Sequence, residues 1–324
     1  MTADLTNPIF NDEDAAWAHF EAIRWADGRV CPHCGVVDQS TAMKGRTTRR
    51  GLYQCNACRK PFTATMGTVY EKSHIPMHKW LLASHLMAAS KKGNSAHQLY
   101  RMLGFGSYRT AWFMAHRIRE AMRPVGGAKL GGKGGPVEVD ETFIGHDILN
   151  PVLPGTKRTI HNMNKVLTLV DRNAGEARSF VITDLTMATI APILDANIAR
   201  EAWLMTDEAP RYTGLGWNFA AHGVVNHSAE EYGRWERGVS VSTNWVEGFY
   251  SIFKRGMRGV YQHCGAQHLH RYVGEFDFRY SNRTALGVDD ATRAARAVKG
   301  AVGKRLTYRQ PHGQGPGLHS ATAH

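Results

Sequence analysis

The 324-residue sequence predicts a mixed α/β sheet flanked by helices, preceded by a small cysteine-containing module and a helical region. Four of the five cysteines stand in two C-x-x-C pairs near the N-terminus, and an apolar, basic stretch with helical periodicity follows. After a Gly-rich segment come three strand patterns, a helix, a further strand and later helices, which is the order of a layered α/β domain. The formal net charge of +12 indicates a polyanionic partner, most simply nucleic acid, although generically basic enzymes also exist.

The N-terminal module, residues 1–62, combines a lead-in helix with a metal-binding pattern. Acidic residues 12–14 can occupy the first turn of a helix that runs to about Trp25. Two C-x-x-C knuckles separated by 20 residues then predict a zinc ribbon with four thiolate ligands. Such a zinc ion is structural, because no coordination position stays open; a redox dithiol is the weaker alternative. The predicted ligands are Cys31, Cys34, Cys55 and Cys58.

Residues 63–123 are predicted to form a helical DNA-binding region that ends in a helix-turn-helix. The turn is residues 104–107, and Ser107 can cap the second helix. Residues 90–130 include eight basic side chains and one acid, Glu120, which is typical of a DNA reader, with an ordinary helical hairpin as the alternative. The residues expected to contact DNA in the ribbon and in this region are Lys44, Arg46, Arg49, Arg50, Arg109, Arg117 and Arg119.

A Gly-rich linker, residues 124–136, leads into the second domain, residues 137–285. The linker lacks the spacing of a phosphate-binding loop and follows no strand, so we interpret it as a domain boundary. Residues 286–324 are expected to be a largely disordered C-terminal tail that adds nonspecific DNA affinity. In the second domain we expect strands at 136–145, 165–170, 177–182, 202–207 and 222–228, and helices at 189–200, 242–254 and 268–283.

Three carboxylates of the second domain stand on separate elements. Asp140 lies in the first strand, Asp207 ends a later strand, and Glu247 lies on the helix that follows. Acids from different elements can converge at a sheet edge and hold two Mg²⁺ or Mn²⁺ ions for phosphodiester transfer. Lys254 follows Glu247 by seven residues, close to two helical turns, and could contact a substrate phosphate. Asn244 lies one turn before Glu247 on the same side of the helix.

Neighbouring polar residues have simpler explanations. We interpret His222 and His227 as structural histidines, although a role near the site stays open. Glu138 shares a strand face with Asp140 and could assist metal binding. Glu208 directly follows one of the three acids, so we expect its side chain to point elsewhere.

The chain resembles bacterial insertion-sequence transposases of the ISXO type, which join an N-terminal zinc ribbon to an RNase-H-like DDE catalytic domain. The resemblance implies that Asp140, Asp207 and Glu247 bind the catalytic metals and that Lys254 is the accompanying lysine. Because some relatives have asparagine as the third member, Asn244 is the alternative to Glu247. The resemblance covers nearly the whole chain and rests on NPIFNDEDAAWAHFEAIRW, CPHCG, YQCNACRKPFTATMGTV, VEVDETFIG, LMTDE and STNWVEGFYSIFKRGMRGVYQHC.

The sequence therefore predicts a DNA transposase that cleaves the inverted-repeat ends of its insertion sequence and joins them to target DNA. Because two ends must meet, a homodimer is expected by analogy. The alternatives are a non-enzymatic DNA-binding regulator, a stand-alone RNase-H-like nuclease, and a ribbon protein that binds RNA. No signal peptide and no apolar stretch of about 20 residues is visible, so we expect a cytoplasmic, nucleoid-associated protein without membrane contact.

Overall fold

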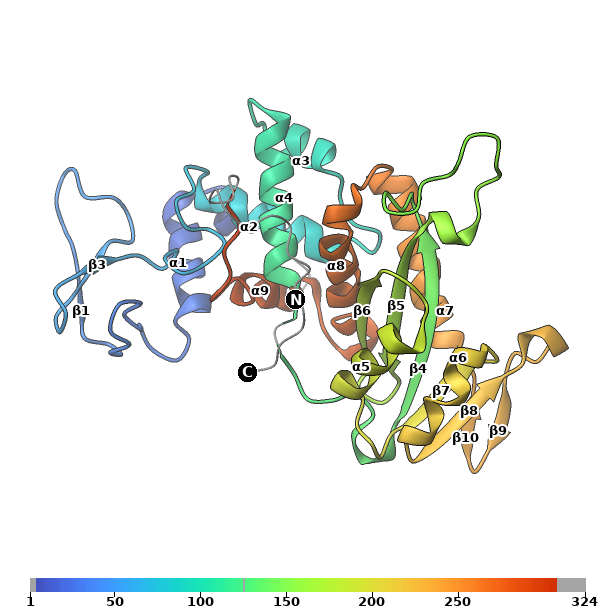
Figure 1. Ribbon diagram of the computed structural model, residues 1–324. Coiled ribbons are helices and arrows are strands. Elements are labelled where there is room, and N and C mark those ends of the chain that lie inside the picture. The colour runs from blue at the N-terminus through green and yellow to red at the C-terminus, as the bar shows by residue number, and fades with distance from the viewer. Residues whose placement is uncertain (1–3, 125, 308–324) are drawn as a thin grey trace.

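The computed structural model describes residues 4–124 and 126–307. Figure 1 shows the small N-terminal sheet at one end of the molecule, a group of helices in the middle and a larger sheet at the other end. None of the helices in these two ranges is long and apolar enough to cross a membrane.

The N-terminal module consists of one helix and a small antiparallel sheet. Helix α1 (Glu13–Arg24) begins after Asp12, whose side chain accepts a hydrogen bond from the N–H of Ala15 at 2.7 Å. This acidic N-cap explains why the predicted helix starts where it does. The sheet has the order β1-β2-β3, formed by Ser40–Ala42, Tyr53–Cys55 and Pro61–Phe62.

The helical region packs around one apolar core. Its helices are α2 (Met77–Ala89), α3 (Ala96–Met102) and α4 (Tyr108–Met122). Helix α4 begins after Ser107 as predicted, but the Ser107 side chain makes no capping hydrogen bond. Trp80 of α2 and Met114 of α4 are both 1% exposed in this core.

A C-terminal helix completes the same core. Helix α9 (Asp290–Lys299) buries Ala297 and Val298 in the core that α2 and α4 share. The expectation of a largely disordered tail over residues 286–324 is therefore wrong for this helix. An Asp289 N-cap and apolar residues at helical spacing give it one face to bury. Residues 308–324 lie outside the described part of the chain.

The larger sheet has five strands in the order β6-β5-β4-β7-β8. Strands β6, β5 and β4 pair antiparallel, whereas β4, β7 and β8 pair parallel, so the predicted mixed sheet is confirmed. The strands are β4 (Pro136–Ile144), β5 (Asn164–Asp171), β6 (Glu176–Ile182), β7 (Trp203–Asp207) and β8 (Ala221–Val225). A two-stranded ribbon of β9 (Arg234–Glu236) and β10 (Val239–Val241) follows.

Helices cover both faces of this sheet. Helix α5 (Met187–Asn197) and the short α6 (Pro210–Thr213) pack on the face that carries Val137 and Val139. Helices α7 (Asn244–Gly256) and α8 (Leu269–Ser281) pack on the face that carries Val166 and Val170. Because side chains alternate along β4, its even-numbered residues face α7.

Helix α8 also joins the sheet to the helical region. It contacts β6 on one side and α4 on the other (Figure 1). Inside this junction, Nε of Arg119 on α4 donates a hydrogen bond to Oε2 of Glu275 on α8 at 2.7 Å, and both side chains are at most 1% exposed. The helical region and the sheet are therefore held together by a buried ion pair as well as by apolar contacts.

Candidate active site

Asp140 and Asp207 lie on neighbouring parallel strands, each two residues beyond the last residue paired between them. In the β4–β7 pairing Glu138 lies opposite Met205, an offset of 67 residues. The same offset, carried two residues further, places Asp140 beside Asp207, and adjacent strands are about 4.8 Å apart. Side-chain alternation puts Asp140 on the same face as Glu138, toward α7.

The electrostatics of Asp140 show that the three predicted acids are neighbours. Burial, followed by the negative charges of Glu141, Asp207 and Glu247, raises the pKa of Asp140 to about 7. The N–H of Glu141, which donates to Oδ1 of Asp140 at 2.7 Å, only partly opposes this shift. Crowded carboxylates are the donor set that hard divalent cations neutralise, so Asp140, Asp207 and Glu247 fit Mg²⁺ or Mn²⁺.

The three acids are spaced more widely than the ribbon cysteines. Among the described residues, the ligand atoms of the four ribbon cysteines all lie within 4.8 Å of one another, whereas those of the three acids do not. A pair of ions about 3.5–4 Å apart does not require every acid to reach the same ion.

Buried Glu138 fixes the N-terminus of α7. Its Oε2 accepts hydrogen bonds from the backbone N–H groups of Trp245 at 2.8 Å and Val246 at 2.9 Å, which have no partner within the helix. Its Oε1 accepts one from Nε of Arg172 at 2.6 Å, and Arg172 also donates to a backbone carbonyl just before the helix. Glu138, expected to assist the metal, therefore instead orients the helix that carries Glu247.

His227 lies at the site, which sequence reasoning did not favour. Oε1 of Glu247 accepts a hydrogen bond from Oγ1 of Thr243 at 2.8 Å, and Nε2 of His227 lies 3.5 Å from the same oxygen. Oε2 of Glu208 accepts from the N–H of His227 at 2.9 Å and so holds the turn that presents the imidazole. As expected, Glu208 itself binds this turn rather than joining the three acids. His222, by contrast, lies 2.9 Å from buried Oγ1 of Thr206, as a structural histidine should.

Lys254 and Asn244 lie on α7 on either side of Glu247. Nζ of Lys254 is 6.0 Å from the ring centre of Tyr250, and the Tyr250 hydroxyl donates to the carbonyl of Asp140 at 2.5 Å. Tyr250 thus connects the segment of α7 that carries Lys254 to strand β4, which carries Asp140. Asn244 is the first residue of α7 and is exposed. The charge of Glu247 contributes to the raised pKa of Asp140, which shows that Glu247 lies near it.

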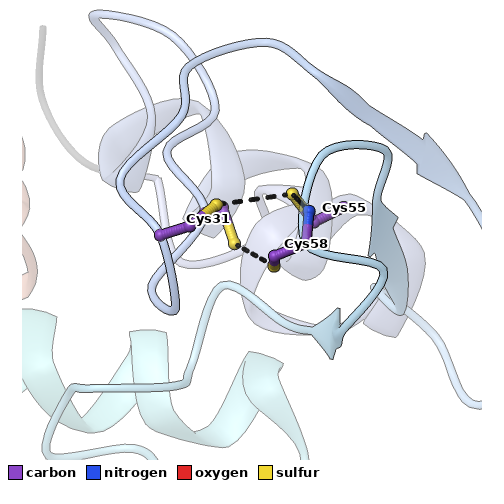
Figure 2. A group of neighbouring side chains, drawn as sticks. Cys31, Cys55 and Cys58 are labelled. Carbon is purple, nitrogen blue, oxygen red and sulfur yellow. Dashed lines mark hydrogen bonds between the residues drawn. The ribbon is translucent and has the colours of Figure 1, made fainter.

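The four predicted zinc ligands form one cluster (Figure 2). Sγ of Cys31 lies 3.8 Å from Sγ of Cys58, and Sγ of Cys34 lies 3.7 Å from Sγ of Cys55. These separations are those of thiolates around a single tetrahedral ion, since Zn–S bonds of about 2.3 Å place sulfurs slightly less than 4 Å apart. The cluster therefore fits a structural zinc ribbon.

Removing the metal is expected to unfold the ribbon while the rest of the chain stays folded. The ribbon has only a small apolar cluster of its own, and structural zinc supplies about 10–16 kcal/mol to comparable modules. The protein should carry one zinc per chain by elemental analysis. Chelation, or Cys55→Ser, should remove it and expose residues 31–62 to protease, whereas Cys264→Ser should change neither. Full zinc content in Cys55→Ser would contradict this assignment.

The basic residues predicted to contact DNA separate into two groups. The exposed group consists of Lys44, Arg46, Arg49, Arg50 and Arg109. The prediction is wrong for Arg117 and Arg119, which are 8% and 1% exposed. Nη2 of Arg117 donates to the carbonyl of Glu71 at 2.7 Å, and Arg119 pairs with Glu275. Both guanidinium groups are enclosed by protein and cannot reach a phosphate.

Comparisons with known proteins match both the N-terminal module and the second domain to transposase domains. A family model described as the ISXO2-like transposase domain matches residues 131–281, and one described as the transposase zinc-ribbon domain matches residues 11–61. The chain is 30% identical over 253 residues to an uncharacterized protein in transposable element ISH50 of Halobacterium salinarum, covering 74% of this chain and 82% of that protein.

A chain in the cryo-EM structure of a simian T-cell lymphotropic virus intasome with PP2A regulatory subunit B56 gamma is 12% identical, with a TM-score of 0.28. That match covers 55% of this chain and 63% of the other, which is less than two thirds of the other chain's length. The matched catalytic domain is that of an enzyme of the transposase and nuclease type. Because its zinc ribbon and its second domain match these family models and it is 30% identical to the ISH50 protein, the chain belongs to the ISXO2-like, or IS1595, family of insertion-sequence transposases.

Proposed function

We propose that the protein is a DNA transposase that cuts the inverted-repeat ends of its own element and joins them to target DNA. The proposal is supported chiefly by the electrostatic influence of Asp207, on the adjacent strand, and of Glu247, on α7, on the buried Asp140. The family match supports it, since transposases act on DNA.

Each acid has a defined part in this proposal. Asp140, Asp207 and Glu247 would hold two Mg²⁺ or Mn²⁺ ions, which activate the attacking oxygen and stabilise the leaving one. Lys254 would bind a non-bridging phosphate oxygen and align the scissile phosphate. His227, next to Glu247, would keep that carboxylate in place.

The reaction then runs through two displacements at phosphorus. In the first, a water oxygen bonds to phosphorus at the element end and the P–O3′ bond breaks, which leaves a 3′-hydroxyl on the element. In the second, this 3′-oxygen bonds to a target phosphorus and displaces the target's own 3′-oxygen. Each step forms one P–O bond and breaks one, so no external energy source is required.

The DNA partners follow from the same proposal. Exposed Lys44, Arg46 and Arg49 on the ribbon would contact phosphates of the terminal repeats. Two ends must be held for joining, so the active form would be a homodimer. A protein that acts on chromosomal DNA would work in the cytoplasm at the nucleoid.

The deciding experiment offers the protein labelled duplexes that carry the ends of its element. With Mg²⁺ it should nick at the element boundary and transfer the 3′ end to a second duplex, and it should do neither in EDTA or with scrambled ends. Nicking without joining would indicate a stand-alone nuclease. Tight binding without Mg²⁺-dependent nicking would indicate a regulator, and either result would overturn the proposal.

A further inference from the structure

The loop between α2 and α3, residues 90–95, packs directly against the C-terminal end of α7. A Cβ atom at Gly256, the last residue of α7, would lie 2.7 Å from the carbonyl oxygen of Lys92. A Cβ atom at Gly93 would lie 1.7 Å from the hydroxyl oxygen of Tyr261, which ends the π-helical turn after α7. Both glycines are therefore needed for backbone to approach this closely.

Internal hydrogen bonds hold this loop in one shape. Oγ of Ser90 donates to the carbonyl of Gly93 at 2.9 Å, and Nδ2 of buried Asn94 donates to the carbonyl of Leu86 at 2.5 Å. Lys91 and Lys92 lie between these anchors and are both exposed. The loop thus presents two ammonium groups at a fixed place beside the active-site helix.

The helix continues the same positive charge toward the acids. Lys254 follows Glu247 by seven residues and so lies on the same side of α7, whereas Arg255 lies about 80° further round the helix. Arg258 stands on the π-helical turn, Met257–Tyr261, that continues α7. From Lys254 to Arg258 the three cations span about 6 Å at about 1.5 Å per residue, which is roughly two phosphate spacings along one strand of a DNA duplex.

One of these cations already has polar partners, because the guanidinium of Arg255 donates to the carbonyl and hydroxyl oxygens of Ser251. In residues 4–124 and 126–307, no carboxylate forms an ion pair with Lys91, Lys92, Lys254, Arg255 or Arg258. Elsewhere on the surface, arginines such as Arg234 are paired with acids, at 2.9 Å from Glu231 in that case. Unpaired positive charge that runs toward a phosphodiester-transfer site suits a DNA backbone.

We propose that Lys91 and Lys92, together with Arg255 and Arg258, form a track for one strand of the element end. The track would lead that strand from the helical region to Lys254 and the three acids. This inference rests on the proposed function and adds the path of the DNA to it. It assigns the α2–α3 loop, rather than buried Arg117 and Arg119, as the place where the helical region meets the DNA near the cleavage point.

The test measures binding without chemistry. Affinity for a labelled end duplex is determined by fluorescence anisotropy in EDTA across a series of salt concentrations. Lys91→Ala/Lys92→Ala should bind on the order of tenfold more weakly per lysine at about 0.1 M salt, and its salt slope should fall by about two. The matched control, Lys133→Ala/Lys299→Ala, removes the same charge from exposed positions away from α7 and should bind nearly as well as the wild type.

Two outcomes separate the track from the proposed function. If the Lys91/Lys92 variant has wild-type thermal stability but binds like the control, the track is wrong even if the wild type nicks and joins DNA. If the variant loses affinity and salt slope while the wild type never nicks, the track stands and the proposed reaction fails. A variant with lowered thermal stability is replaced by Lys91→Gln/Lys92→Gln, which keeps the side-chain length and should show the same loss.

Discussion

Replacing Asp140 with asparagine is expected to stabilise the metal-free protein above pH 7 and to abolish Mg²⁺-dependent cleavage. Burial and the neighbouring acids raise the pKa of Asp140 from its ordinary 3.8 to about 7. The folded state therefore holds a proton that the unfolded chain releases near pH 4. The resulting stabilisation is complete below that pH and is lost as pH rises through 7.

The size of this effect follows from the shift. Each pKa unit corresponds to about 1.4 kcal/mol, so ionised Asp140 costs at most about 4 kcal/mol of folding free energy, and less to the extent that water reaches it. An asparagine has no charge to lose, so Asp140→Asn should keep its stability between pH 5 and pH 8 while the wild type declines. The same substitution removes a metal ligand, and we expect cleavage to fall by roughly 10³-fold or more.

The measurement combines melting temperatures in EDTA at several pH values with nicking assays in Mg²⁺. Asp195→Asn is the control, because Asp195 is a surface residue that pairs with Arg200 at 3.3 Å, and it should alter neither readout. Wild-type nicking by Asp140→Asn would remove this residue from the mechanism. Parallel stability–pH curves for the two proteins would show that ionisation of Asp140 does not cause the wild type's loss of stability as the pH rises.

From the sequence alone, each candidate acid could be assigned to its strand or helix, because that assignment depends on local geometry. Strand alternation predicted that Asp140 lies in the first strand, and the end of an apolar strand pattern predicted the position of Asp207. In the structure, the 67-residue offset between the paired strands β4 and β7 brings these two acids near each other. Helical spacing likewise placed Glu247 and Lys254 on one side of α7. These predictions needed only the periods of a strand and a helix.

What could not be predicted depends on contacts between distant segments. His227 reaches Glu247 only because Glu208, 19 residues earlier, binds its turn, and no periodicity marks such a contact. Helix α9 packs on helices that begin more than 160 residues earlier, so its core lies elsewhere in the chain. The burial of Arg119 could have been predicted from helical spacing. Arg119 stands four residues after buried Ala115 and so lies toward the apolar face of α4.

Replacing Glu275 with alanine should destabilise the protein by about 3–5 kcal/mol, because it leaves two arginines buried without a counter-charge. Glu275 is fully buried between Arg119 of α4 and Arg279 of its own helix, and the Tyr261 hydroxyl donates to its Oε1 at 2.6 Å. Asp195→Ala is the control, because its pairing with Arg200 is at the surface and such pairs contribute at most about 1 kcal/mol. Urea unfolding gives both values, and a Glu275→Ala loss no larger than the control's would contradict this role.

Replacing Glu275 with alanine should also weaken DNA binding, because Tyr261 connects Glu275 to the loop that carries Lys91 and Lys92. This tyrosine bonds Glu275 on one side and touches Gly93 on the other, so it links the buried ion cluster to the loop that carries Lys91 and Lys92. Without the carboxylate, Tyr261 loses its hydrogen-bond partner and the loop loses the surface that fixes it. We therefore expect Glu275→Ala, at temperatures where it is still folded, to weaken end binding in EDTA, whereas the surface control Asp195→Ala should not. Unchanged binding by folded Glu275→Ala would show that the loop keeps its position without the cluster.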